Sequence, residues 1–283
     1  MFKMLKQARA AVSLLNPEEA RHRAEQPVHV GLVAADDAAY REIADILMPL
    51  GMAERARLES LQRVHRADDP NVPASVDLVL YQDGIPPEDG SYSFDARNPA
   101  AALSEILDDH RHLALPLARQ FPVFRKPVID SIIRAVAREN ALFAIATALP
   151  NIVPNVIELP WAFGEFASDT AFLTSNQIRM AFQIAAACGR IPGYSEQKGE
   201  ILSIVAGAFG WRALARELVG HIPLGGGLIP KGAIAWAGTF AVGKSLEFYN
   251  QANRLFTPAQ RAAVYRQALP HGKQVAESLR PVN

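Results

Sequence analysis

Four residues in the last quarter of the chain have the types and spacing of a phosphate-binding loop. The stretch GTFAVGKS matches the pattern G-x-x-x-x-G-K-[ST] at every fixed position, namely Gly238, Gly243, Lys244 and Ser245. In a working loop the glycines let the backbone approach the phosphates, the lysine neutralises them and the hydroxyl binds Mg²⁺. Such a loop also needs a strand before it, a helix after it and further strands that carry the remaining catalytic groups. The chain after Ser245 has no strand-like run that ends in aspartate, so a nucleotide-binding GTPase-type switch at this motif is the alternative hypothesis and not the preferred one.

A helical interpretation explains more residues of the same stretch. Ala233, Ala237, Ala241 and Ser245 lie four residues apart and would form a ridge of small side chains along one helix. A ridge of this kind lets a second helix approach closely. An anion-binding loop needs free backbone N–H groups, whereas a helix uses them in its own hydrogen bonds. We therefore predict a packed helix here, no binding of GTP or ATP, and no cofactor.

A second candidate for chemistry is a set of polar residues in an otherwise apolar helical segment: Glu158, Glu165, Asp169 and Asn176. Carboxylates on one helical face can ligate a metal when a second helix supplies histidine or glutamate. The sequence has no matching E-x-x-H motif, and several arginines are available to neutralise the carboxylates. We interpret the four residues as a structural polar seam and not as a metal site.

Two histidines and the single cysteine complete the candidates. His110 and His112 fall in a predicted loop without a third ligand nearby in the sequence, which favours a surface position over a metal site. Cys188 closes an apolar helix and has no basic neighbour before Arg190, so we expect a buried, unreactive thiol. The sequence thus predicts no catalytic residue and no metal ligand.

The first half of the chain has the pattern of a small α/β module. Residues 27–34 predict a buried strand, and residues 74–83 predict a second one. Between them, residues 36–51 predict a helix with an aspartate as its cap. Residues 83–99 are rich in turn-forming types. Strand, helix and strand in this order indicate an α/β unit that is small and incomplete.

The second half of the chain is helical. Apolar periodicity predicts helices in residues 124–149, 155–189, 195–208 and 211–220, followed by terminal helices. The expected fold is α+β and mostly α, with an N-terminal amphipathic helix in residues 1–26, a small α/β module in residues 27–122 and an all-helical module in residues 123–283.

Three long segments of the second half carry a resemblance to a known family. They are AVARENALFAIATALPNIVPNVIELPW, GEFASDTAFLTSNQIRMAFQIAAACG and EILSIVAGAFGWRALARELVGHIPLGGGLIPKGAIAWAGTFAVG, within roughly residues 124–256. These segments resemble the helical domain of unknown function in bacterial YcjF-like proteins, which commonly follows an Era-type GTPase domain. The resemblance implies that GTFAVG belongs to the helical domain, and that the protein is found at the inner membrane.

The resemblance also implies that the front half descends from a P-loop GTPase, whose phosphate loop should follow the first strand. The chain reads AADDAAYREI at that point, with neither glycine nor lysine, and Asp36 and Asp37 would repel phosphate. No D-x-x-G and no N-K-x-D motif occurs in the sequence. We therefore expect a degenerate module, the remnant of a GTPase.

The composition of the chain limits which binding partners and which cellular location we expect. The 29 Lys and Arg residues balance 29 Asp and Glu residues, so there is no electrostatic reason to expect nucleic acid as a partner. One cysteine fits a reducing compartment, and the charged N-terminus lacks the apolar core of a signal peptide. The most hydrophobic windows are interrupted by proline, glycine or charge, which favours peripheral over spanning attachment to a membrane. A membrane-inserted helical hairpin is a further alternative. We expect a non-enzymatic interaction or scaffold protein that is cytoplasmic, with an unknown protein partner or the inner-membrane surface as its target and homo-oligomers as an option.

Overall fold

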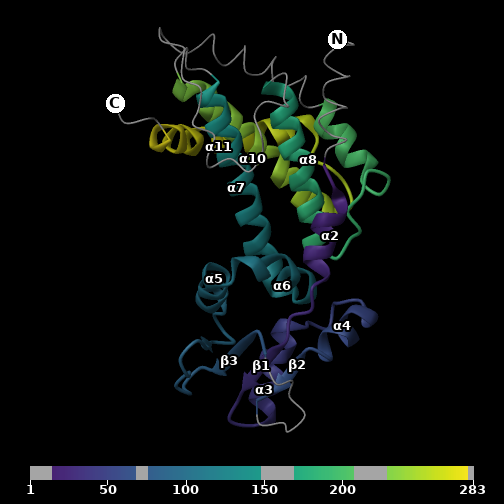
Figure 1. Ribbon diagram of the computed structural model, residues 1–283, viewed down its shortest axis with the longest axis vertical. Coiled ribbons are helices and arrows are strands. Elements are labelled where there is room, and N and C mark those ends of the chain that lie inside the picture. The colour runs from purple at the N-terminus through teal and green to yellow at the C-terminus, as the bar shows by residue number, and fades with distance from the viewer. Residues whose placement is uncertain (1–14, 68–75, 148–168, 207–227, 280–283) are drawn as a thin grey trace. The chain divides into compact units, whose positions relative to one another are not determined.

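The protein has two compact units, which the computed structural model describes over residues 15–67, 76–147, 169–206 and 228–279 (Figure 1). The α/β unit comprises Glu19–Asp130 and Ala186–Ile191, and the helical unit comprises the rest of the chain. The division after Asp130 falls inside a helix, whereas the sequence analysis placed a boundary near residue 122. The expectation of an α+β fold that is mostly α is confirmed.

The α/β unit is built on a four-stranded parallel sheet with the order β2-β1-β3-β4. The strands are β1 (Val30–Val33), β2 (Val64–Arg66), β3 (Leu78–Gln82) and β4 (Tyr92–Phe94). In the register of the sheet, Val30 lies opposite both Val64 and Leu78. The two strands predicted from the sequence are confirmed as β1 and β3. The turn-rich segment 83–99 contains β4, which was not predicted.

Helices pack against this sheet. By the register of the strands, Leu32, Leu80 and Phe94 lie on the same face of the sheet, and all three are fully buried. The helix α3 (Asp37–Leu47) contacts β3 and the short helix η2 (Pro122–Phe124), and α5 (Ala100–Asp109) contacts β4. The predicted cap is confirmed, because the Asp36 side chain accepts a hydrogen bond from the Ala39 N–H at the start of α3.

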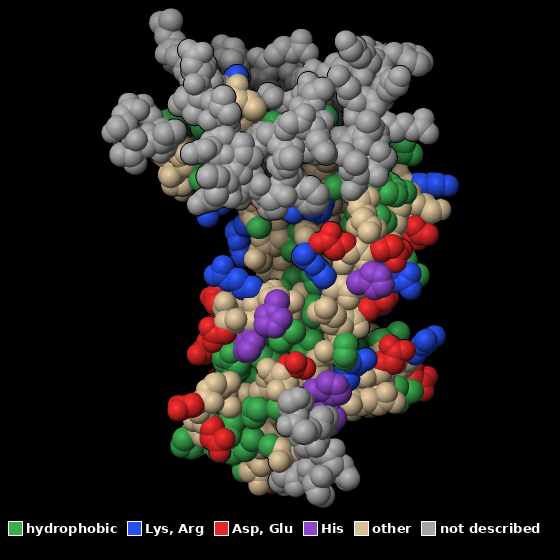
Figure 2. All heavy atoms as spheres, viewed as in Figure 1, with side chains coloured by type: hydrophobic (Ala, Val, Ile, Leu, Met, Phe, Trp, Pro, Cys, Tyr) green, Lys and Arg blue, Asp and Glu red, His purple; other side chains and the backbone are tan. Residues whose placement is uncertain are grey.

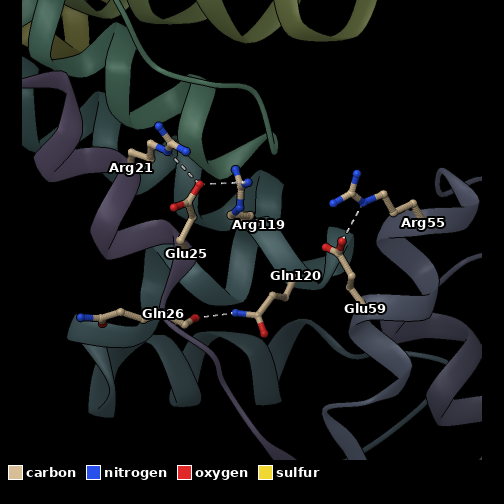
Figure 3. Close-up of polar contacts among 7 residues, drawn as sticks. All are labelled: Arg21, Glu25, Gln26, Arg55, Glu59, Arg119 and Gln120. Carbon is tan, nitrogen blue, oxygen red and sulfur yellow. Dashed lines mark hydrogen bonds and ion pairs between the residues drawn. The ribbon is translucent and has the colours of Figure 1, made fainter.

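The side chain of Gln120 ties several parts of the α/β unit together (Figure 3). It lies at the end of α6 (Ala114–Gln120), which follows η1 (Arg111–Leu113). Its amide N–H donates to the Gln26 carbonyl at 2.8 Å, and its amide oxygen accepts from the Val28 N–H at 3.2 Å. The Gln120 carbonyl also accepts from the Ser60 hydroxyl at 2.9 Å. One residue thus holds the segment that enters β1 and the helix α4 (Glu54–Leu61). The Glu25–Arg119 ion pair, at 3.6 Å, supports the same contact from α2 (Pro17–Glu25).

The helical unit packs long helices through small side chains. Its described helices are α7 (Arg125–Ala146), which begins in the α/β unit, then α8 (Asp169–Ala187), residues 198–206, α10 (Leu228–Ala252) and α11 (Pro258–Ser278). The core cluster shared by α7, α10 and α11 consists of Ala137, Ala141, Trp236, Ala237, Ala241, Tyr265 and Ala268. Alanines on the facing sides let these helices approach closely around the two large rings.

The phenol in this core makes the stability of the helical unit sensitive to alkali. Burial raises the pKa of Tyr265 to about 12, whereas an unfolded tyrosine ionises near pH 10. The unfolded state therefore loses its proton first as the pH rises. The stabilisation is complete below about pH 10 and is lost as the pH rises through about 12.

We predict that Tyr265→Phe flattens this alkaline loss of stability. Urea unfolding at a series of pH values between about 9 and about 11.5 measures the slope of the free energy of unfolding against pH. Tyr249→Phe, a change at a half-buried tyrosine of α10, is the matched control. Equal slopes for the natural protein and Tyr265→Phe would contradict the prediction.

Candidate functional site

The sheet order defines where a ligand site is expected. The chain moves from β1 to β2 on one side and then crosses back to β3 on the other, so β1 and β3 are the neighbours at which the strand order reverses. In open parallel sheets, ligands bind outside the carboxyl ends of the strands at this position. The segments that line it are residues 34–37 after β1 and residues 83–85 after β3.

Side chains of the protein already use the backbone groups at this position. The Gln82 amide oxygen accepts a hydrogen bond from the Ala35 N–H at 2.9 Å. The Asp36 carboxylate accepts from the Ala39 N–H at 2.8 Å and so occupies the N-terminus of α3 with its own negative charge. A helix N-terminus at a sheet edge can hold phosphate because its N–H groups are free and its dipole is positive. Here the Asp36 carboxylate takes the place that a phosphate would occupy.

The arginine at the end of β2 is also engaged. Arg66, at the end of β2, forms an ion pair with Asp37, and its guanidinium lies 5.2 Å from the centre of the Tyr40 ring. Asp83 is exposed at the end of β3. The segments around this edge therefore carry three carboxylates, Asp36, Asp37 and Asp83, beside the paired Arg66, and this charge balance disfavours the binding of phosphate. Among the described residues there is no group of three histidines, cysteines or carboxylates that could hold a metal ion.

The GTFAVGKS motif lies inside α10, so the predicted helix is confirmed. The strand and the loop that a phosphate-binding motif requires are replaced by a continuous helix over Leu228–Ala252. The Ser245 hydroxyl accepts a hydrogen bond from the Phe256 N–H at 3.0 Å, and Lys244 pairs with the buried Glu247. Gly238 is buried as well. The four motif residues thus take part in the packing of the helical unit.

Gly243 has a specific packing role. A Cβ atom on Gly243 would lie 2.6 Å from Cγ1 and 2.8 Å from Cγ2 of Ile133 in α7. Real side chains do not approach this closely, so only glycine allows α10 and α7 to meet at this level. The predicted ridge is confirmed too, because Ala233, Ala237 and Ala241 are all fully buried.

The predicted polar seam is described only in part. Glu158 and Glu165 lie outside the described residues, and of Asp169 only the backbone, at the start of α8, is described. Asn176 is buried. An ion pair between α7 and α8 joins Glu139 and Arg179, two residues that the sequence analysis did not single out.

Asn176 belongs to a buried hydrogen-bond network that connects three helices. Its amide donates to the Asn140 oxygen in α7 at 2.9 Å, and the Asn140 amide donates to the Thr239 hydroxyl in α10 at 2.8 Å. Gln177 of α8 donates to the same hydroxyl at 3.3 Å. All four side chains are buried. The network consists of neutral amides and a hydroxyl, and Arg179 donates to the Asn176 amide oxygen at its border, at 3.4 Å. This composition suits a structural role that fixes the register of the helices.

A sequence signal for this network exists. Ile133, Val136, Ala137, Asn140 and Ala141 follow the spacing of a single buried helical face. A polar residue in such a stripe faces the core and needs a partner there. The position of Asn140 could therefore have been predicted, although not the identity of its partners.

Among the described residues, none of His110, His112 and Cys188 belongs to a group that could hold a metal ion. His112 is exposed and His110 is half-buried, with its ring edge-on to Tyr92 at 6.0 Å between centroids. Burial, and then the hydrogen bond from the Tyr92 hydroxyl to Asp109 at 3.1 Å, raise the pKa of Tyr92 to about 12. Cys188 is half-buried, which corrects the expectation of a buried thiol, because the residue lies just beyond the end of α8 at Ala187. Burial lowers the pKa of Arg125, and the nearby Cys188 opposes that shift.

Comparisons of the chain with family models, curated proteins and solved structures gave no significant match. None of the described helices combines the length and the apolar character needed to cross a bilayer. On the face shown in Figure 2, basic and acidic side chains are interspersed over the described surface, without a large patch of one sign. The site must therefore be interpreted from its own chemistry.

Proposed function

We propose that the protein is a non-enzymatic interaction protein, in which a pseudo-GTPase-like α/β unit is joined to a YcjF-like helical unit. The α/β unit serves as a docking platform and does not bind or turn over nucleotide. The proposal places the protein in the cytoplasm, with peripheral contact to the inner membrane, as the family resemblance implies.

The carboxyl edge of the sheet is the observation that carries this proposal. It has the position of a nucleotide site but is engaged by Gln82, Asp36 and the Asp37–Arg66 pair. A phosphate would have to displace the carboxylate at the start of α3 and would gain no free cation from Arg66. The second support comes from α10, where the residues of the GTFAVGKS motif are buried or paired within the helical unit.

The proposal predicts that neither GTP nor ATP binds to the purified protein. Isothermal titration calorimetry with the Mg²⁺ complexes of both nucleotides, up to about 1 mM, is expected to give no binding heat. This result would mean that any binding free energy is weaker than about −4 kcal/mol, the value for a dissociation constant of about 1 mM. Two variants locate any binding that is seen. Asp37→Ala removes negative charge at the sheet edge, and Lys244→Ala removes the lysine of the motif.

Micromolar binding that is lost in Lys244→Ala would overturn the proposal in favour of a GTPase-type switch at GTFAVGKS. Because Lys244 is paired with a buried carboxylate, the variant must first be shown to keep its thermal unfolding transition. The contact with Glu247 predicts that Lys244→Ala lowers the stability by about 1–3 kcal/mol, the cost of removing one partner of a buried carboxylate.

A further inference from the structure

The helix α4 is packed with its polar side inward and its apolar side outward. Ser60 is only 3% exposed and donates to the Gln120 carbonyl. Arg57 donates to the Met48 carbonyl and to Asp45, both at 3.2 Å. On the outer side, Leu58 is 55% and Leu61 41% exposed. An ordinary surface helix has the reverse pattern.

Leu58 and Leu61 lie three residues apart and so share one face of α4. A third exposed leucine, Leu50, lies in the turn that precedes α4 and is 83% exposed. Burying a leucine side chain is worth about 1.5–3 kcal/mol. This leucine surface, formed by Leu58 and Leu61, would therefore gain free energy from a partner that covers it.

We infer that the leucine surface of α4 is a dimer interface, and that its partner is α4 of a second copy of this chain in antiparallel orientation. The inference rests on the proposed function, because it names one partner of the docking platform. The two copies would be related by a two-fold axis that passes close to Leu58, so that the two Leu58 side chains meet at the centre.

The charges beside the leucines are self-complementary. Arg55 and Glu59 lie four residues apart on α4, form an ion pair at 3.0 Å and are 92% and 60% exposed in their side chains (Figure 3). In an antiparallel pair of helices, Arg55 of one copy faces Glu59 of the other, and the reverse contact forms on the other side of the axis. The chain as a whole has no net charge, so two copies do not repel each other at long range.

The same charges argue against a lipid surface as the occupant. Helices that bind anionic membranes carry lysines and arginines beside their apolar face. Here Glu54 and Glu59 accompany a single arginine, Arg55, on the exposed part of α4. Two carboxylates beside one arginine favour a protein partner over an anionic membrane, and a second copy supplies its Arg55 to face Glu59.

The interface is small, so the dimer is weak. An eight-residue helix is about 12 Å long, and interfaces well below about 1,200 Å² belong to transient complexes. We expect a dissociation constant on the order of 10 µM. Sedimentation velocity from about 1 to about 200 µM should therefore show a shift from monomer to dimer.

The substitution Leu58→Glu places two carboxylates at the two-fold axis and should weaken the dimer at least about tenfold, which corresponds to 1.4 kcal/mol. Leu202→Glu is the matched control, because Leu202 is 68% exposed in the helical unit and lies outside the proposed interface. It should leave the dissociation constant unchanged. Thermal unfolding of both variants checks that each is folded.

Charge exchange tests the antiparallel arrangement. Arg55→Glu should weaken the dimer, and the double variant Arg55→Glu/Glu59→Arg should restore it, because the exchanged charges again face each other. A monomer at every concentration overturns the inference, as does a dimer that Leu58→Glu leaves intact or that Leu202→Glu disrupts equally. A monomer leaves the proposed function standing, whereas nucleotide binding contradicts the proposed function whatever the state of association.

Discussion

Replacing Asn140 with leucine is expected to lower the free energy of unfolding of the helical unit by about 2–4 kcal/mol. The two residues are similar in size, so the loss does not come from a cavity. It comes from the partners, because Asn176 loses its acceptor while it stays buried, and Thr239 loses one of its two donors and keeps Gln177. A buried polar group left without a partner costs about 1–3 kcal/mol, and the lost hydrogen bond to Thr239 adds about 1 kcal/mol.

Urea unfolding followed by circular dichroism measures this loss, and a second variant shows its origin. The double change Asn140→Leu and Asn176→Leu removes the acceptor together with its buried donor, while Thr239 keeps the hydrogen bond from Gln177, and should therefore recover a large part of the lost stability. Asn250→Leu is the matched control in α10, where the amide of a half-buried asparagine donates to a backbone carbonyl. A loss below about 1 kcal/mol in Asn140→Leu would mean that the network contributes little.

Gly243→Ala is expected to destabilise the protein by about 1–3 kcal/mol, although alanine is the better helix former by about 1 kcal/mol. The added methyl would overlap with Cγ1 and Cγ2 of Ile133, and a branched side chain on a helix has no other easy rotamer. Gly199→Ala is a suitable control, because a Cβ atom there meets nothing within 4 Å. That change should be neutral or stabilising.

A double-mutant cycle assigns the Gly243 effect to its neighbour. Ile133→Ala alone leaves a cavity and costs about 2–5 kcal/mol. In the double variant with Gly243→Ala, the space left by Ile133→Ala can hold the new methyl group. The loss of stability in the double variant should therefore be smaller than the sum of the two single losses by at least about 1 kcal/mol. Strict additivity would show that Ile133 is not what excludes a side chain at position 243.

Local signals in the sequence predicted the elements whose information is local. The apolar pattern of residues 27–34 predicted β1, and the Asp36 cap predicted the start of α3. The small-residue ridge predicted the helix at GTFAVGKS, against the match to a loop motif. In each case the residues that decide the structure are close together in the sequence, within a single strand or within a few turns of one helix.

The remaining features depend on residues that are distant in the sequence. The strands β2 and β4 have three residues each and are stable only beside β1 and β3, so their own sequences carry little signal. Asn140 and Thr239 are 99 residues apart and meet only once α7 and α10 are packed. The reversed polarity of α4 follows from bonds to Gln120 and Met48, which no periodicity in residues 54–61 could predict.

The bonds made by Gln120 also set an order of events during synthesis. The Val28 N–H and the Gln26 carbonyl find their partner 92 and 94 residues later in the chain. At a translation rate of about 5–20 residues per second, β1 leaves the ribosome roughly 5–20 s before Gln120 does. During that interval the nascent chain carries an apolar strand, and the segment that leads into it cannot yet form its hydrogen bonds with Gln120. The first opportunity for chaperones, and for mispairing between neighbouring nascent chains, therefore lies between these two residues.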